Sequence, residues 1–145
     1  MFFSQDRKQL REGFFSAWDK QQQQQPLTPL EEIIAGVIKM HPEYQKLVTQ
    51  KDQHAEREYP PELGETNPFL HMAMHIALHE QISTDRPTGI RDVARQLLEK
   101  QKVAHDAEHL MMEQLAEEMW RSQRYNVLPD EQAYLTQLQE LVRKL

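Results

Sequence analysis

The sequence contains no cysteine. Disulfide bonds, zinc sites with thiolate ligands and cysteine nucleophiles are therefore excluded, so the fold must be stabilised by packing or by a bound ligand. A lack of cysteine is compatible with a reducing compartment, and we expect this protein in the cytoplasm.

Glycine is also scarce, with four residues at positions 13, 36, 64 and 89. Because they are scattered, they form neither a phosphate-binding loop nor a dinucleotide fingerprint, and the Gly-x-Ser-x-Gly motif is absent. No stretch approaches the ~20 apolar residues that a membrane helix needs, so we expect no membrane span. Basic runs are lacking and the net charge is -6, which argues against a nucleic acid partner.

Apolar residues recur with helical spacing along most of the chain, and no alternating strand pattern is visible. A first helix is expected from Ser4, its cap, to about Lys20, followed by a glutamine-rich linker at residues 21–26. Thr28-Pro29-Leu30-Glu31 has the form of a capping box and predicts a second helix, which pauses at His41-Pro42.

The next segment, residues 51–66, is polar and shows no periodicity. It predicts a long loop, which either covers a site or only crosses the surface. Asn67-Pro68 then begins a third helix, and the segment from Thr84 to Gly89 ends it before Thr88 caps the next one.

Residues 90–125 contain neither glycine nor proline. Their inward stripe passes through Leu98, His105 and Met112, and Trp120 is expected to pack in the core. The middle of the stripe is polar. The segment is therefore either one long helix with polar groups in the core, or two helices that meet near residues 100–102.

A last amphipathic helix follows Pro129-Asp130-Glu131. The predicted fold class is all-α, a helical bundle with a four-helix core and an additional C-terminal helix. At 145 residues, the chain is expected to form a single helical domain over residues 1–145.

Histidines lie within the apolar stripes of two of these helices. His71 and His75 form one His-x-x-x-His pair, and His105 and His109 form another, with Glu108 beside it. Residues four apart on a helix are rotated by only about 40° and separated by roughly 6 Å, so the two rings of a pair can face one point. Burying an imidazole or a carboxylate requires a hydrogen bond, a charge partner or a metal ion.

Two interpretations of these residues stay open. Either His71, His75, His105 and His109, with Glu108, supply ligands to one divalent transition metal ion (Zn, Fe, Ni or Mn), or they form a buried polar network. His75, His105 and His109 are the leading ligands, with His71 or Glu108 as the fourth. The His-Glu-x-x-His signature and the paired Glu-x-x-His elements of diiron proteins are absent, which favours a mononuclear, histidine-rich site.

Several phrases of the sequence carry a family resemblance. They are Asn67-Pro68-Phe-Leu-His71, Thr84-Asp85-Arg86-Pro87-x-Gly89, Ala107-Glu108-His109-x-Met111-Met112-Glu113 and Pro129-Asp130-Glu131. Together with His41-Pro42-Glu43-Tyr44, they make the chain resemble the bacterial family called domain of unknown function 1841. The resemblance implies no activity and no catalytic residues. More loosely, the histidine layout is similar to that of metal-binding four-helix bundles of the DinB kind.

Two functions follow as expectations. The first is a metal-binding protein with hydrolase-like or transferase-like chemistry at an open coordination position. The second is a non-enzymatic interaction or structural module with a protein partner or a second copy of the chain.

Overall fold

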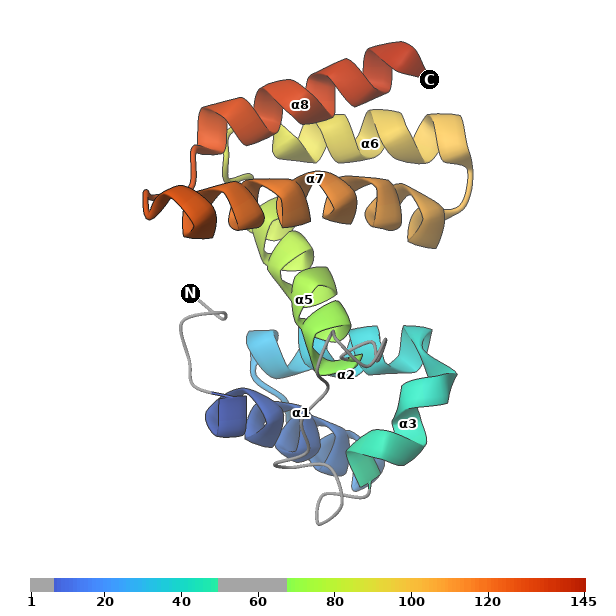
Figure 1. Ribbon diagram of the computed structural model, residues 1–145. Coiled ribbons are helices and arrows are strands. Elements are labelled where there is room, and N and C mark those ends of the chain that lie inside the picture. The colour runs from blue at the N-terminus through green and yellow to red at the C-terminus, as the bar shows by residue number, and fades with distance from the viewer. Residues whose placement is uncertain (1–6, 50–67) are drawn as a thin grey trace. The chain divides into compact units, whose positions relative to one another are not determined.

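The computed structural model describes residues 7–49 and 68–145, and these residues form seven helices and no strand (Figure 1). The helices are α1 (Arg7–Gln22), α2 (Pro29–Met40), α3 (Pro42–Thr49), α5 (Pro68–Thr84), α6 (Ile90–Gln101), α7 (Ala104–Tyr125) and α8 (Glu131–Lys144). The all-α prediction is confirmed. None of the described helices is long and apolar enough to cross a membrane.

The chain divides into two compact units, unit 1 with residues Met1–Ile76 and unit 2 with residues Ala77–Leu145. The division falls inside α5, whose first part belongs to unit 1 and whose second part belongs to unit 2. The prediction of a single domain over residues 1–145 stays a prediction. The predicted cap at Ser4, the loop at residues 51–66 and the cap at Asn67 lie outside the described residues.

Local signals determine how α1 and α2 are joined in unit 1. α1 ends at Gln22, two residues into the glutamine run, and residues 25–28 have no regular structure. The capping box is confirmed: Thr28 Oγ1 accepts a hydrogen bond from the Glu31 backbone N–H at 3.2 Å, and Glu31 Oε1 accepts one from the Thr28 N–H at 2.9 Å. Lys20 lies 2.8 Å from Glu31 and lowers the pKa of this carboxyl.

The break between α2 and α3 also agrees with the sequence. α2 ends at Met40, and α3 begins at Pro42, since a proline is tolerated in the first turn of a helix but disrupts its interior. His41 lies between the two helices with φ -126° and ψ 73°. The Tyr44 N–H donates to the His41 carbonyl at 2.8 Å and starts the new helix.

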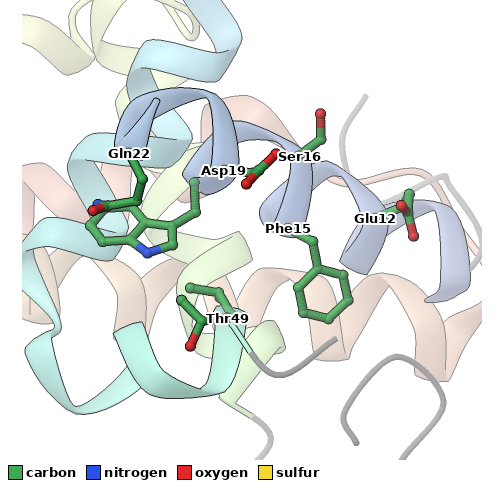
Figure 2. A pocket seen from close by; sticks show the side chains of 8 residues that line it. Glu12, Phe15, Ser16, Asp19, Gln22 and Thr49 are labelled. Carbon is green, nitrogen blue, oxygen red and sulfur yellow. The ribbon is translucent and has the colours of Figure 1, made fainter. Parts of the chain in front are cut away.

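α1 and the end of α3 border a groove of about 420 Å³ (Figure 2). Its apolar side chains include Phe15, Trp18 and Val48, all of them buried. Glu12 and Asp19 also line it and are exposed.

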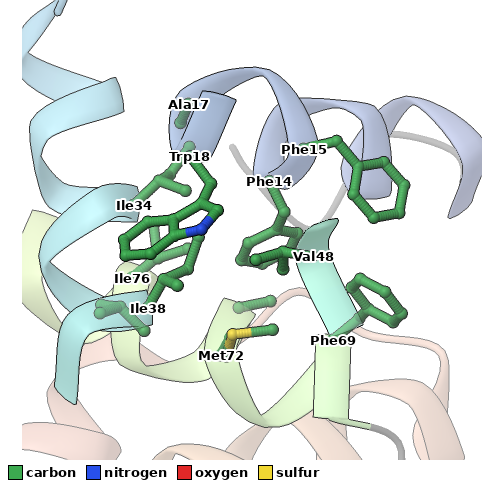
Figure 3. Close-up of a cluster of buried hydrophobic side chains, with 12 residues drawn as sticks. Phe14, Phe15, Ala17, Trp18, Ile34, Ile38, Val48, Phe69, Met72 and Ile76 are labelled. Atoms are coloured by element: carbon green, nitrogen blue, oxygen red, sulfur yellow. The ribbon is translucent and has the colours of Figure 1, made fainter. Parts of the chain in front are cut away.

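The core of unit 1 is built from all four of its described helical segments (Figure 3). Phe14 and Phe15 of α1 contact the Phe69 ring of α5, with ring centroids 5.8 and 6.0 Å apart. The other buried members are Ala17 and Trp18 of α1, Ile34, Val37 and Ile38 of α2, Val48 of α3, and Met72, Ala73 and Ile76 of α5. This core packs the first turns of α5 against α1, α2 and α3.

Residues 90–125 of unit 2 form two helices, which is one of the two alternatives that the sequence left open. α6 ends at Gln101, and α7 begins at Ala104. Between them Lys102 adopts a left-handed conformation with φ 65°, and its N–H donates to the Leu98 carbonyl at 2.8 Å. The alternative of two helices is therefore confirmed.

Two predicted core positions in this region are wrong. Leu98 is 43% exposed, because the buried face of α6 runs through Ile90, Val93 and Leu97, and the break at Lys102 gives α7 its own register. Trp120 is 61% exposed, because the buried residues of α7 end at Leu115, more than a turn earlier.

The start of α6 differs from the prediction as well. Thr88 does not cap it. Instead Gly89, at φ 105°, occupies the cap, and Asp85 Oδ1 accepts hydrogen bonds from the N–H groups of Gly89 and Arg91 at 3.2 and 3.0 Å. A glycine suits this position because a positive φ costs it little.

α6, α7 and α8 lie side by side and contact one another (Figure 1). Asp130 caps α8 through its hydrogen bond with the Ala133 N–H at 2.9 Å. The Tyr134 hydroxyl donates to Gln81 of α5 at 2.8 Å, and burial raises the pKa of this tyrosine. The buried apolar residues of unit 2 include Leu78, Ile90, Leu97, Met111, Leu115, Leu135 and Leu138.

Replacing Lys102 by glycine is expected to raise the free energy of unfolding by about 0.5 to 1 kcal/mol, because glycine lacks the Cβ that disfavours a positive φ. Lys102→Ala keeps the Cβ and is the matched control, for which no gain is expected. Chemical denaturation of the two variants and the parent measures the difference. Equal stabilities of the Gly and Ala variants would contradict this explanation of the break.

Candidate metal site

Three histidines of unit 1 bring their rings together. His71 and His75 lie one turn apart on α5, and His41 approaches them from the break between α2 and α3. The ring centroids are 4.9 Å apart for His71 and His75, 4.7 Å for His41 and His75, and 5.2 Å for His41 and His71. We call these three residues the histidine cluster.

The cluster lies mostly inside unit 1. His75 is 0% exposed and His41 is 3% exposed, whereas His71 is half-buried. A ring nitrogen of His41 lies within 4.8 Å of a ring nitrogen of His75. Two buried imidazoles therefore present nitrogen atoms to each other at close range.

The orientation of His41 is set by a hydrogen bond to the last turn of α2. Its Nδ1 lies 2.8 Å from the backbone carbonyl oxygen of Val37. A carbonyl oxygen only accepts hydrogen bonds, so in the neutral ring Nδ1 carries the proton and Nε2 carries the lone pair. The Nε2 atom is thus the one that can ligate a metal ion.

Tyr44 covers one side of the His41 ring. The two rings are stacked, with centroids 5.4 Å apart and an interplanar angle of 17°. Tyr44 also lies edge-on to His71 at 6.3 Å. Tyr44 is half-buried, and desolvation, followed by the charge of Glu43, raises the pKa of its phenol.

The second predicted pair lies in unit 2, in the first turns of α7. The rings of His105 and His109 meet edge-on, with centroids 4.1 Å apart, and a nitrogen of each lies within 4.8 Å of the other. Both residues are half-buried. The pairing that the four-residue spacing implies is present in this helix.

Glu108 is engaged with another residue of unit 2. Its Oε1 lies 2.5 Å from Nε2 of His79 on α5. The Glu108 side chain is 12% exposed and that of His79 is 37% exposed. The carboxylate that the sequence offered as a metal ligand therefore contacts a histidine.

The structure thus brings the predicted residues together within each unit. His71 joins His75 in unit 1, and His105 joins His109 in unit 2. His41 was missed as a site residue. Its signal in the sequence was a histidine directly before the helix-starting Pro42, next to the apolar stripe that contains Val37 and Ile38.

The groove between α1 and α3 is a separate feature of unit 1. No histidine lines it, so its chemistry differs from that of the histidine cluster.

Comparison with known proteins supports the family resemblance of the sequence. No curated protein matches the chain, and no solved structure does, so the looser likeness to DinB bundles stays a prediction. A family model described as "Domain of unknown function (DUF1841)" matches residues 6–140, which is nearly the whole chain. The protein therefore belongs to the DUF1841 family.

Proposed function

We propose that this protein binds one divalent transition metal ion through neutral histidine side chains, with the histidine cluster as the centre of the site. The observation that carries the proposal is the convergence of three imidazole rings, with centroids 4.7, 4.9 and 5.2 Å apart. Metal–nitrogen bonds of ~2.0–2.1 Å at tetrahedral angles bring the centres of two ligating rings to about 5 Å from each other. The centroid distances in the cluster are compatible with ligation of one ion.

The hydrogen bond of His41 supports the same proposal. Metal-bound histidines generally donate their second ring N–H to a carbonyl or a carboxylate, which fixes the tautomer and orients the ring. His41 has such a bond to the Val37 carbonyl at 2.8 Å. This bond leaves Nε2 of His41 as the ring nitrogen that would ligate the ion.

The donor type narrows the choice of metal. Imidazole favours Zn, Fe, Ni and Cu, whereas Mn prefers oxygen ligands. The ligands assigned in the histidine cluster are all ring nitrogen atoms. Among the predicted metals, Zn, Fe and Ni are therefore preferred over Mn.

Three protein ligands leave a coordination position for water or substrate. A bound metal lowers the pKa of such a water and makes hydroxide available near neutral pH. Hydrolase-like or transferase-like chemistry in the cytoplasm is the activity we assign to the site.

The proposal also includes two ligands of unit 2, His105 and His109, which are predicted from the sequence. His105 and His109 have the spacing of a chelating pair and rings in contact. Their centroid distance of 4.1 Å is shorter than that of two rings on a tetrahedral ion, so the rings would separate on ligation.

A second candidate function is a non-enzymatic interaction module whose histidines form a buried polar network. The contact of His79 with Glu108 and the bond of His41 to Val37 favour it, since each gives one ring nitrogen a polar neighbour without an ion. Large apolar side chains are also exposed near the end of α7, with Trp120 61%, Tyr125 62% and Leu128 88% exposed. Exposed apolar groups of this kind suit contact with a protein partner or a second copy.

His75→Ala is expected to abolish stoichiometric metal binding, because it removes the most buried ligand. The parent protein should lose about 3 to 4 kcal/mol of unfolding free energy on treatment with EDTA, if free metal exceeds the dissociation constant by 100- to 1,000-fold. Metal analysis of tag-free protein and thermal melting with and without EDTA measure both effects.

His75→Gln and His79→Ala are the controls for this experiment. The first keeps much of the side-chain volume without the imidazole, and should also lose the metal. The second removes another histidine of α5, one that contacts Glu108 of α7, and should retain the metal. A parent that holds no metal after expression in supplemented medium, and that EDTA does not destabilise, would support the polar network.

His105→Ala and His109→Ala test the ligands predicted in unit 2. If either residue ligates the ion, its variant should bind metal at least tenfold more weakly, while the apoprotein changes little. If both are only packing groups, the variants should be destabilised equally with and without EDTA, through a cavity and orphaned partners. Isothermal titration with Zn²⁺, combined with melting of each apoprotein, separates these outcomes.

Metal affinity should fall with decreasing pH, because ligation needs neutral imidazole and free imidazole protonates near ~6.5. The stability that the metal contributes is thus present above this pH and is lost below it. Dialysis at stepped pH followed by metal analysis follows the loss. Metal retained unchanged down to about pH 4.5 would mean that histidine is not the main ligand.

A further inference from the structure

The last turns of α7 carry an aromatic ring between two opposite charges on the surface of unit 2. Trp120 is 61% exposed, although tryptophan is on average a highly buried residue. The Arg124 guanidinium lies over the Trp120 ring, 5.6 Å from its centroid. Glu117, three residues before Trp120, is exposed, and so is Arg124. We call Glu117, Trp120 and Arg124 the α7 face.

Helix geometry brings the three side chains of the α7 face to one side of α7. Successive residues of an α-helix are rotated by about 100° and rise by about 1.5 Å. Glu117 and Arg124 are seven residues apart, so they are rotated by only about 20° and separated by about 10.5 Å along the axis. Trp120 lies between them in height, within about 60° of each. Buried Leu115 is about 140° away from Trp120, so the α7 face points away from the core of unit 2.

The end of α7 is held in place by local hydrogen bonds. The Val127 N–H donates to the Ser122 carbonyl at 3.0 Å. Glu118 Oε1 accepts hydrogen bonds from the Arg121 guanidinium at 2.6 Å and from the Asp130 N–H at 2.7 Å. The bond from Arg121 lowers the pKa of the Glu118 carboxyl, which therefore stays charged at neutral pH. Because this end of the helix is already ordered, little conformational entropy is lost when a partner binds to it.

The α7 face is complementary to itself. In a two-fold symmetric dimer the same patch of both copies meets, so if residue i contacts residue j of the other copy, then j also contacts i. Two copies of α7 that pack antiparallel, with the axis midway between Glu117 and Arg124, place each Glu117 opposite the Arg124 of the other copy. Both ion pairs are attractive, and the two Trp120 rings come close to the axis. A parallel arrangement would place like charges opposite each other, so the charges select the antiparallel one.

We infer that the α7 face joins two copies of this chain in an antiparallel, two-fold symmetric dimer. An anionic membrane suits this face less well, since Glu117 lies on it and the net charge of the chain is -6. Stable interfaces bury about 800 Å² per partner, which is more than two turns of one helix offer, so the dimer is weak and exchanges with the monomer. The inference is independent of the proposed metal site, because no histidine belongs to the α7 face.

Sedimentation equilibrium of the full-length, metal-free protein tests for this dimer. A reversible monomer–dimer equilibrium is expected between about 1 µM and about 1 mM protein. Trp120→Ala should weaken dimerisation at least tenfold, because a central tryptophan commonly contributes much of the binding energy of an interface. Tyr125→Ala is the matched control. Tyr125 is 62% exposed on the same helix but lies about 140° around it from Trp120, so this variant should dimerise like the parent.

Charge reversal tests the antiparallel arrangement. Glu117→Arg and Arg124→Glu each place like charges opposite each other in both pairs of the homodimer, so each variant alone should dimerise at least tenfold more weakly than the parent. Mixing the two variants makes both pairs attractive again. The mixture should therefore form heterodimers more tightly than either variant pairs with itself, and the double variant should recover dimerisation in the same way.

Three results would overturn the inference. The first is a parent protein that stays monomeric over the whole concentration range; co-sedimentation with lipid vesicles then tests whether the surface belongs to a membrane. The second is an equal loss of dimerisation in Tyr125→Ala and Trp120→Ala. The third is a mixture of the two charge variants that associates no better than either variant alone. All the substituted side chains are exposed, so the variants should keep the helical content of the parent, which circular dichroism measures.

Discussion

Burial of imidazole is the constraint on which the histidine cluster depends. Each ring carries two polar nitrogens, and a buried polar group costs several kcal/mol unless it meets a hydrogen-bonding partner or a metal ion. One of these nitrogens, Nδ1 of His41, has such a partner. Because α2 ends at Met40, the His41 ring can donate a hydrogen bond to the Val37 carbonyl. The end of α2 therefore also determines the orientation of the His41 ring.

Pro42 allows a new helix to begin directly after the break. A proline is tolerated in the first turn of a helix, so α3 starts directly after His41 and brings Tyr44 back over the His41 ring. The apolar core of unit 1 then holds α5 in place through Phe69, Met72 and Ile76. His71 and His75 lie among these core residues in the sequence, so the packing that stabilises unit 1 also positions two of the three rings.

The elements that depend on neighbouring residues were predicted well from the sequence. The capping box at Thr28, the pause at His41 and the turn of α5 that pairs His71 with His75 are all local in the chain. The break at Lys102 was only one of two alternatives, because a left-handed lysine leaves no composition signal as a glycine would. Leu98 and Trp120 were placed inside because one uninterrupted helical register was extended across that break and beyond the buried part of α7.

The site was harder to predict than the helices, since its third ring comes from a distant part of the chain. Spacing within a helix reveals pairs such as His71 and His75, but it contains no information on which other segment faces them. His41 is separated from them by about thirty residues, and only tertiary packing brings the rings to 4.7 and 5.2 Å. Glu108, predicted as a ligand from its position beside His109, stays a prediction; the structure adds its contact with His79, which spacing within one helix could not reveal.

The two candidate functions differ in what the ring nitrogens must do. In a polar network, each neutral imidazole donates one N–H and accepts at its other nitrogen, so the rings form a chain of donors and acceptors. At a metal ion, three lone pairs must converge on one point. The proton on Nδ1 of His41 is compatible with both, since in either case Nε2 receives a donor or an ion. His71 and His75 therefore decide between the two, because only a metal requires both of them to direct a lone pair at the same point as Nε2 of His41.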